Sequence, residues 1–310
     1  MISIDEIYHQ FLQCPKIVTD SRQDVTEAIF IALKGEKFDG NRFAREAIQK
    51  GASLAIIDNP GYLLPGQCIL VENTLQTLQN LARMHRRNNP AKIIGITGSN
   101  GKTTTKELIG AVLSSDFKTI VTQGNLNNHI GVPLTMLSIK KDTEFAVIEM
   151  GANHPGEIHT LCEIARPDYG IVTNIGKAHL EGFGSLEGVA SAKTELYRFI
   201  QKNNGLLFVN KDNELLMKRS ENISRITYGS SPGAACSGRI VNRHPAISLE
   251  WTWQNFHGFA NTNLYGDYNF ENILAAICIG MYLDVSPAGV SRALQAYVPE
   301  NNRSQWLHTP

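Results

Sequence analysis

One glycine-rich turn constrains the fold of this chain more than any other feature. An apolar stretch of strand character, Ile93–Ile96, leads into Gly98-Ser99-Asn100-Gly101-Lys102-Thr103, and a segment with helical spacing follows. In that order, glycines let backbone N–H groups turn toward a phosphate, and the helix N-terminus adds partial positive charge. Lys102 supplies a cation and Thr103 a hydroxyl for Mg²⁺. The turn therefore predicts a phosphate cradle and an enzyme that handles a nucleoside triphosphate.

The spacing of this turn differs from that of the standard P-loop. The standard pattern places a glycine five residues before the glycine of Gly-Lys-Thr, and Ile96 occupies that position here. A chance glycine-rich turn is the alternative interpretation. Strand, glycines, Lys-Thr and helix nevertheless occur together in the order that the motif requires, which favours phosphate binding.

Composition is that of an ordinary globular protein. The 310 residues are 42% hydrophobic and 19% charged, enough for two domains with a large core. Lys+Arg and Asp+Glu both number 29, so the zero net charge does not favour a nucleic-acid-binding or membrane-binding surface. The sequence has no bilayer-spanning apolar run and no signal peptide at its start, so we expect a cytoplasmic protein without membrane insertion. The five scattered cysteines are expected to be buried free thiols.

The chain divides into two predicted domains near Pro90, which cannot continue the helix that precedes it. Residues 1–88 predict a small mixed α/β domain. In residues 89–310, helices near 103–114, 130–138, 156–165 and 187–200 alternate with strand-like runs at Ile93–Ile96, Thr119–Val121, Phe145–Ile148, Gly170–Thr173 and Leu206–Val209. That alternation predicts an α/β domain with a mostly parallel sheet and helices on both faces, and residues 224–264 predict an antiparallel edge.

Two side chains follow strands of this predicted sheet. Glu149 ends the strand at 145–148, and His179 lies in the loop after the strand at 170–173. Ligands of open α/β sheets collect at the carboxyl ends of strands. We therefore expect Glu149 to bind Mg²⁺ or to position water, and His179 to join the same site. A solvated strand-end glutamate and a structural histidine are the alternatives, and Lys193 resembles an ordinary helix lysine.

The segment Gly124–Pro133 is unusually rich in amide side chains, with Asn125, Asn127 and Asn128 next to His129. Amides donate and accept hydrogen bonds equally well. A loop that caps the following helix is one interpretation. A loop that binds a polar substrate is the interpretation that we favour, because the loop follows another strand of the sheet.

Together these residues resemble the Mur ligase family, the ATP-dependent amide-forming enzymes of peptidoglycan assembly. Thr97–Thr103 is similar to the short P-loop of that family, which accounts for the missing glycine at position 96. The segments that resemble the MurF branch in particular are Gly124–Asn128, Glu149–Ile158 and His179–Ser185.

The resemblance implies ATP and two Mg²⁺ ions as cofactors. Lys102 and Thr103 would bind the ATP phosphates and one Mg²⁺ shared with Glu149, and His179 would hold the second ion. Lys193 matches a lysine that many Mur ligases carry as a carbamate, which would make it a ligand of that second metal. The other implied nucleotide contacts are Gly98, Asn100, Gly101, Thr104, Asn272 and Arg303.

The resemblance also implies the reaction and the substrates. A MurF-type enzyme adds D-alanyl-D-alanine to UDP-MurNAc-tripeptide through an acyl phosphate, and we expect a monomer. Ser21, Arg22 and Lys34 match the UDP-binding elements of the first domain. The Asn125, Asn127 and Asn128 loop is the remaining expected substrate contact.

One departure from the family concerns the C-terminal Rossmann-like domain, which is expected after Pro310 and is absent from these 310 residues. A fragment of this length is expected to be inactive alone. Another Mur ligase such as MurE, a folylpolyglutamate synthase, and a non-catalytic module for UDP-sugar or ATP are the alternatives. The first-domain motif at Asp20-Ser21-Arg22 argues against the synthase.

Overall fold

The structure is a computed structural model that describes residues 2–176 and 180–299. Within these residues the chain forms two compact units. The first comprises residues up to Pro90 together with Gly124–Lys141 and Glu163–Ala165, and the second comprises the other described residues. The units are therefore not contiguous in sequence, whereas the sequence predicts one uninterrupted domain to residue 88. That domain assignment stays a proposal.

The first unit is built on a four-stranded sheet of order β1-β2-β5-β6, in which every pairing is parallel. Its helices begin where the sequence provides caps: Ser3 and Glu6 form a capping box, and Asn73 accepts from the N–H of Gln76. The elements are α1 (Ile4–Gln13), β1 (Ile17–Val18), β2 (Ile29–Ile31), β3 (Lys34–Gly35), β4 (Phe38–Asp39), η1 (Gly40–Phe43), α2 (Ala44–Gln49), β5 (Leu54–Ile57), η2 (Pro60–Tyr62), β6 (Cys68–Leu70), α3 (Thr74–Arg87) and α5 (Gly131–Leu137).

The second unit is built on a nine-stranded sheet of order β15-β14-β13-β12-β11-β10-β7-β9-β8. Its strands are β7 (Lys92–Thr97), β8 (Thr119–Val121), β9 (Phe145–Glu149), β10 (Tyr169–Val172), β11 (Leu206–Asn210), β12 (Arg225–Gly229), β13 (Cys236–Asn242), β14 (Ser248–Trp253) and β15 (Phe256–Asn261). The helices are α4 (Lys102–Leu113), α6 (Glu157–Ala165), α7 (Leu180–Phe183), α8 (Leu186–Lys193), α9 (Glu195–Lys202), α10 (Glu214–Arg219), α11 (Asn269–Tyr282) and α12 (Pro287–Ala296).

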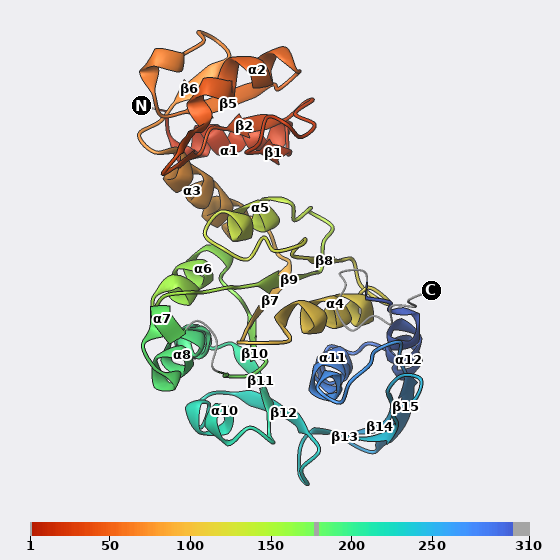
Figure 1. The fold of residues 1–310 in the computed structure, drawn as a ribbon. Coiled ribbons are helices and arrows are strands. Elements are labelled where there is room, and N and C mark those ends of the chain that lie inside the picture. The colour runs from red at the N-terminus through yellow and green to blue at the C-terminus, as the bar shows by residue number, and fades with distance from the viewer. Residues whose placement is uncertain (1, 177–179, 300–310) are drawn as a thin grey trace, which may run out of the picture. The chain divides into compact units, whose positions relative to one another are not determined.

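The predicted mostly parallel sheet with an antiparallel edge is confirmed. The pairings from β8 to β13 are parallel, and only β13–β14 and β14–β15 are antiparallel. The predicted edge at 224–264 was wrong for β12, which pairs in parallel with both of its neighbours. Figure 1 shows α4 and α11 on one face of this sheet and α8 and α10 on the other.

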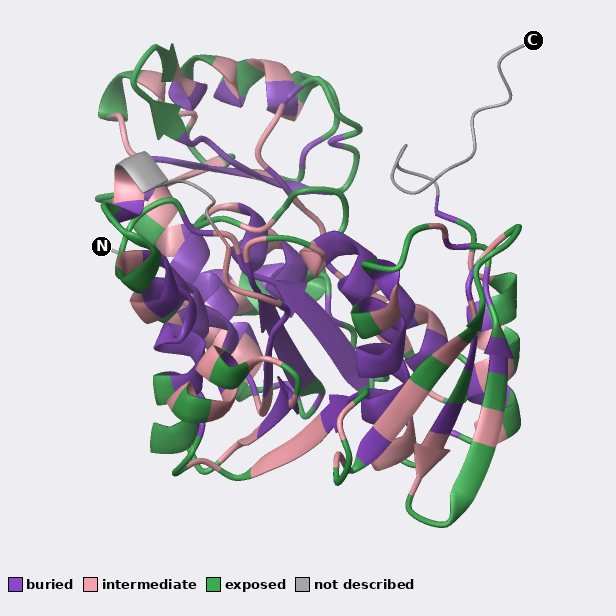
Figure 2. Cartoon of the chain, turned by 60° about the horizontal axis from the view of Figure 1, so that its bottom comes forward, coloured by how far each residue is buried: buried purple, intermediate pink, exposed green. Residues whose placement is uncertain are grey.

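Burial follows the position of each strand in the sheet. The interior strand β9 is buried along its whole length, whereas the edge strand β15 is mostly exposed (Figure 2). A strand covered by helices on both faces is expected to be apolar, and β9 is apolar up to Glu149, its last residue. The core of this unit joins α4 and α11 to the sheet, so both helix N-termini are held rigidly at its carboxyl edge.

Two local expectations were wrong. The predicted helix at 187–200 is split at Thr194, whose hydroxyl donates to the carbonyl of Ala190 at 2.8 Å and ends α8. All five cysteines are free, but Cys14 and Cys68 are only partly buried. The other three are buried as expected.

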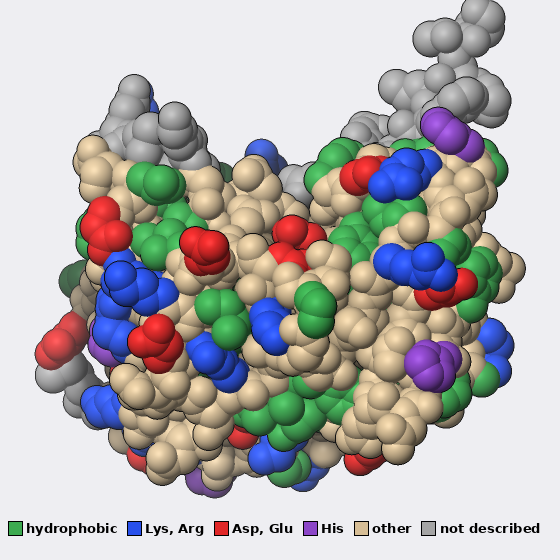
Figure 3. Space-filling model, turned by 90° about the horizontal axis from the view of Figure 1, so that it is seen from below, with side chains coloured by type: hydrophobic (Ala, Val, Ile, Leu, Met, Phe, Trp, Pro, Cys, Tyr) green, Lys and Arg blue, Asp and Glu red, His purple; other side chains and the backbone are tan. Residues whose placement is uncertain are grey.

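Surface charge agrees with the balanced composition. On the face drawn in Figure 3, basic and acidic side chains are interspersed with hydrophobic ones. Among the helices of the described chain, none is both long enough and apolar enough for a bilayer crossing.

Candidate functional site

The predicted phosphate loop lies between β7 and α4, and its glycines are required by geometry. Gly98 has φ +146° and Gly101 has φ +76°, values that side chains strain to adopt. A Cβ on Gly98 would lie 2.0 Å from the Thr173 hydroxyl, and one on Gly101 would lie 2.6 Å from the Asn272 amide oxygen. The loop is thus packed so closely that no other residue type fits at these positions.

Residues after β10 hold the loop in place. Asn174 accepts from the N–H of Ser99 through its carbonyl and from the N–H of Asn100 through its side chain, both at 3.0 Å. The Thr173 hydroxyl donates to the carbonyl of Asn100 at 2.6 Å. Because the Asn100 backbone is used in this way, a contact of Asn100 with a nucleotide has to come from its side chain.

Lys102 begins α4 and folds back over the loop. Its Nζ donates to the carbonyls of Gly98 at 2.8 Å and Ser99 at 3.3 Å. The next residues, Thr103 and Thr104, are buried in the first turn of α4. A lysine ammonium above a glycine turn and a hydroxyl at a helix N-terminus are the groups that bind phosphate and its magnesium ion.

Glu149 ends β9 at the same edge of the sheet, because its strand pairs with β7 and places Glu149 opposite Ile96. Its N–H donates to the Thr122 hydroxyl at 2.9 Å. The carboxylate is buried and lies 3.8 Å from the ammonium of Lys106, a buried lysine of α4. The alternative of a solvated strand-end glutamate is therefore wrong.

Lys106 is a candidate that the sequence analysis missed. The sequence does show its spacing from Lys102: Lys106 lies four residues later and so on the same face of α4. Nothing in the sequence alone distinguishes this lysine from an exposed one.

Lys193, at the end of α8, is also buried, so its interpretation as an ordinary helix lysine is wrong. Its Nζ donates to the carbonyl of Ala152 at 3.3 Å and lies 5.6 Å from the centre of the Phe183 ring. Burial, and to a lesser extent the charge of Lys102, lower the pKa of Lys193 to about 8. The structure thus brings Lys102 and Lys193 within electrostatic range of one another.

Asn272 braces the phosphate loop from α11. Its amide oxygen accepts from the Thr105 hydroxyl at 3.0 Å, and its amide nitrogen donates to Asn269 at 3.0 Å. Its predicted contact with the nucleotide stays a prediction. The two other predicted nucleotide or metal residues, His179 and Arg303, lie outside the described residues.

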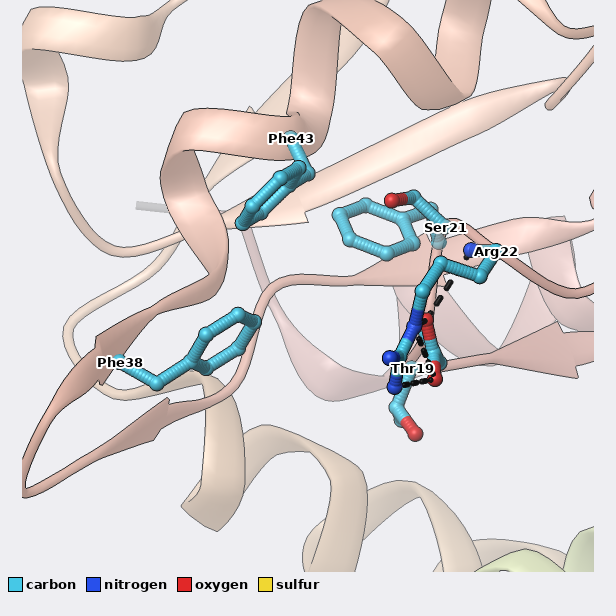
Figure 4. A pocket seen from close by; sticks show the side chains of 7 residues that line it. Thr19, Ser21, Arg22, Phe38 and Phe43 are labelled. Carbon is cyan, nitrogen blue, oxygen red and sulfur yellow. Dashed lines mark hydrogen bonds and ion pairs between the residues drawn. The ribbon is translucent and has the colours of Figure 1, made fainter.

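A second candidate site lies entirely within the first unit. A cavity of ≈ 420 Å³ is lined by Thr19, Asp20, Ser21, Arg22, Phe30, Phe38 and Phe43. Figure 4 shows the Phe38 and Phe43 rings on one side and Ser21 and Arg22 on the other. The two rings are stacked, with centres 5.6 Å apart and planes at 15°. An aromatic wall opposite polar and cationic groups suits a flat base linked to an anion.

Arg22 and Asp20 form an ion pair at the mouth of this cavity. The guanidinium donates to both carboxylate oxygens, at 2.9 Å through Nε and 2.7 Å through Nη2. These hydrogen bonds lower the pKa of Asp20 to about 2. The ion pair lies at the surface, and 87% of the Arg22 side-chain surface is exposed.

The described residues that line this cavity do not include Lys34. Its ammonium instead lies 2.8 Å from Asp58, which also accepts from the Asn41 side chain at 2.9 Å. The hydrogen bond with Asp58 raises the pKa of Lys34. The charge of Lys34 is thus partly neutralised, which weakens the prediction that it binds substrate.

The asparagine-rich segment belongs to the first unit and precedes α5. The Asn128 side chain accepts from the N–H groups of Ile130 and Gly131, at 3.0 and 2.9 Å. Asn128 therefore organises the start of the helix, as the capping interpretation predicts. The predicted substrate contacts of Asn125 and Asn127 stay predictions.

The donor atoms at the sheet edge suit magnesium. Mg²⁺ is bound by hard oxygen ligands and commonly takes only one or two carboxylates besides phosphate and water. Thr103 and Glu149 provide such oxygens. In the part of the chain that the structure describes, this edge included, His, Cys, Asp and Glu do not gather in groups of three that could hold a metal ion.

Comparisons with known proteins agree with this geometry. Residues 96–280 match the family model described as the Mur ligase middle domain, and residues 16–92 match that described as the Mur ligase family, catalytic domain. The UDP-N-acetylmuramoyl-tripeptide–D-alanyl-D-alanine ligase of Bacillus subtilis (strain 168) is 36% identical over 298 residues, which cover 94% of this chain and 64% of that protein. The ligase of the same name from Escherichia coli (strain K12) is 39% identical, over 89% of this chain and 62% of that protein.

Solved structures show the same likeness. A crystal structure of MurF from Acinetobacter baumannii superposes with a TM-score of 0.84 at 29% identity, over 97% of this chain and 70% of that one. The MurF ligase from Thermotoga maritima in complex with ADP gives a TM-score of 0.79 at 30% identity, over 90% of this chain and 66% of that one. The chain spans 64% and 62% of the length of the two curated relatives.

Proposed function

The chain belongs to the Mur ligase family, and we propose that it is the part of a MurF-type ligase that binds ATP and the UDP-linked substrate. The proposed reaction joins D-alanyl-D-alanine to UDP-MurNAc-tripeptide. The γ-phosphate of ATP passes to the terminal carboxylate, an acyl phosphate forms, and the amine displaces phosphate. The protein is proposed to act in the cytoplasm as a monomer.

One observation carries this proposal. The glycine turn at 98–101 and Lys102 follow β7, and Glu149 ends the parallel neighbour β9, so all three lie at the same carboxyl edge of the sheet. Nucleotide ligands of α/β proteins bind at such an edge. Phosphoryl transfer depends mainly on positioning and on neutralising charge. Lys102 is proposed to supply that neutralisation, and the loop N–H groups are proposed to fix the phosphates.

The proposed metal ligands are Thr103 and Glu149 for one Mg²⁺, with His179 and carbamylated Lys193 for a second. When bound, the ions would supply positive charge against the phosphate oxygens. The burial of Lys193 supports its modification, because a lysine amine reacts with carbon dioxide in its uncharged form and burial favours that form. Gly98, Asn100, Gly101, Thr104, Asn272 and Arg303 are the other proposed nucleotide contacts.

The cavity of the first unit is the proposed site for the uridine diphosphate group. We propose that the uracil ring contacts Phe38 and Phe43 and that Ser21 and Arg22 contact the polar edge and the diphosphate. Residues 1–88 are accordingly proposed as the UDP-substrate domain and residues 89–310 as the ATP-binding domain. Lys34, Asn125, Asn127 and Asn128 are the further substrate contacts proposed from the sequence.

Calorimetric binding to the 310-residue chain tests the proposal. The wild-type chain is expected to bind ADP and UDP independently, and Lys102→Ala is expected to weaken ADP about tenfold to hundredfold, since a charged hydrogen bond contributes about 1.5–3 kcal/mol. UDP binding should not change. ADP affinity that is unchanged in Lys102→Ala would contradict the role of the loop.

A ligation assay then separates the enzyme from a binding module. The protein as it occurs in the cell is expected to form product with D-alanyl-D-alanine and not with single amino acids. Product with a single amino acid would favour a MurE-type ligase. Binding of both nucleotides without any product would favour the non-catalytic module.

A further inference from the structure

Lys106 is a buried charge that the proposed function does not use. Only 2% of its side-chain surface is exposed. Moving an ammonium group out of water is costly, so a buried lysine has to lie close to opposite charge. Lys106 has two such neighbours: its Nζ lies 3.8 Å from Glu149 Oε2 and 3.9 Å from Glu107 Oε1.

The two carboxylates differ in how much they depend on this lysine. Glu107 keeps 22% of its side-chain surface exposed and accepts from the Tyr297 hydroxyl at 2.6 Å. Glu149 is exposed by only 2%. Since water screens the exposed carboxylate more strongly, the charge of Lys106 acts mainly on Glu149.

The position of Lys106 on α4 also matters. Residues three apart on a helix are neighbours on its surface, so Lys106 lies beside Thr103. Thr103 and Glu149 are the two proposed oxygen ligands of magnesium. The backbone of Glu149 is fixed by its bond to the Thr122 hydroxyl, and the Lys106 ammonium lies 3.8 Å from its carboxylate.

The length of the ion pair suits such a role. At 3.8 Å the attraction is electrostatic, and the distance is longer than a hydrogen bond. Lys106 can therefore hold the carboxylate in the site without a directed bond to the oxygen that faces it. In this proposal the metal ion binds the same carboxylate that Lys106 attracts.

We propose that Lys106 is a positioning residue that holds the Glu149 carboxylate directed toward the magnesium position before the metal binds. This inference rests on the proposed function, in which Glu149 binds Mg²⁺ together with a nucleotide. Loss of the Lys106 charge is therefore expected to raise the Mg²⁺ concentration that nucleotide binding requires.

The test measures ADP affinity by calorimetry over a series of Mg²⁺ concentrations and once in EDTA. Lys106→Met keeps an unbranched side chain that is one atom shorter and removes its charge. Its half-saturating Mg²⁺ concentration is expected to rise about tenfold, as residues that orient metal ligands typically contribute. ADP affinity in EDTA should stay within about twofold, because the phosphate loop is unchanged. Lys106→Arg is expected to restore most of the Mg²⁺ response.

Lys118→Met is the matched control. Lys118 lies in the same unit and forms a 2.9 Å ion pair with Asp142, but 68% of its side chain is exposed. Its removal should leave the Mg²⁺ response unchanged. Thermal unfolding of each variant reports whether the chain still folds.

The outcomes separate the inference from the function on which it rests. A Mg²⁺ requirement that is unchanged or lower in Lys106→Met overturns the inference, since a lower one would mean that Lys106 competes with the metal. If the affinity of the wild-type chain for ADP does not depend on the Mg²⁺ concentration, that result counts against the proposed function itself. If Lys106→Met does not fold, Glu107→Gln provides the test, because it removes the other carboxylate near Lys106 and leaves Glu149 in place. A Mg²⁺ requirement within about twofold of wild type then supports the pairing of Lys106 with Glu149. A rise of about tenfold overturns the inference.

Discussion

The cavity of the first unit and the phosphate loop of the second are both proposed nucleotide sites, but their side chains differ in exposure. Phe38 is 51% exposed and the Arg22 side chain 87%. At the phosphate loop, Lys106, Glu149 and Lys193 are each exposed by only 2%. One site presents side chains to the solvent, and the other is assembled from groups that are already packed and paired.

Because of this difference, substitutions at the two sites are expected to affect ligand binding and folding stability differently. Exposed side chains can be changed with little effect on folding, because their surroundings are mostly water. Buried charges and closely packed glycines take part in the fold itself, so a change there affects both stability and ligand. Substitutions in the first site should therefore alter affinity alone, and those in the second should alter both.

The largest expected effect is at Gly101. Gly101→Ala places a methyl group 2.6 Å from Asn272, whose amide is held by Thr105 and Asn269. We expect ADP affinity to fall at least tenfold and the free energy of unfolding to fall by about 2–4 kcal/mol.

Gly66→Ala is the control, because Gly66 has the same φ of +76° and open space around its added Cβ. It should cost only the backbone strain of about 1–2 kcal/mol. If both substitutions have the same effect on unfolding and on ADP binding, close packing is not what requires the glycine at 101.

The second effect concerns the aromatic wall. Phe38→Ala removes one of two stacked rings, and base stacking on an aromatic ring contributes about 1–3 kcal/mol. UDP affinity, measured by calorimetry, is expected to fall about tenfold with the melting temperature nearly unchanged. Phe259→Ala is the matched control, since Phe259 is 48% exposed on β15. Equal UDP binding by both variants and wild type would exclude Phe38 from the site.

A smaller effect is expected at Arg22. Arg22→Ala removes a cation from the cavity and leaves Asp20 with its negative charge toward the diphosphate. UDP affinity should fall about fivefold at low salt and less at high salt. Asp20→Asn combined with Arg22→Ala should recover part of the loss. No recovery in the double variant would show that Asp20 does not repel the ligand.

The smallest effect is a pH dependence of stability in the first unit. His85 is buried in α3, its Nε2 donates to the Ile139 carbonyl at 2.8 Å, and its Nδ1 accepts from the Tyr8 hydroxyl at 3.3 Å. Both nitrogens are thus used in the neutral form. Burial lowers the pKa of His85 below its ordinary value of 6.5, and the carbonyl bond opposes this only in part.

The sign of the effect follows from that shift. The unfolded chain binds a proton as the pH falls through 6.5, whereas folded His85 does so only at lower pH. The stabilising contribution is therefore complete above that value and is lost as the pH falls below it. Melting temperatures at about pH 7.5 and 5.5 should differ more for wild type than for His85→Gln. An equal difference would mean that His85 is not responsible.

Much of the proposed nucleotide site could be predicted from the sequence because topology determines it. Parallel strands end at one edge, so the residues after β7 and β9 had to meet there, and the register of Ile96 with Glu149 confirms it. Helix starts were predictable for a different, local reason. Asn73 and Ser286 cap α3 and α12 with their own side chains.

The rest depends on tertiary packing that the sequence pattern does not record. Lys106 and Lys193 read as helix lysines, and only the neighbouring strands and helices bury them. The residues of β12 could pair in a parallel or an antiparallel direction. The direction is determined by the neighbouring strands β11 and β13, which the local sequence does not reveal. The aromatic wall depends on the short β3–β4 hairpin, which brings Phe38 next to Phe43.

The interleaving of the two units along the chain has a consequence for biosynthesis. The first unit includes Gly124–Lys141 and Glu163–Ala165, and its helix α5 packs against α3. A ribosome must therefore pass residue 165 before that unit has all of its parts. The packing of α5 on α3 cannot form before residues 131–137 are made, so a chain released earlier would expose the α3 surface to chaperones and proteases.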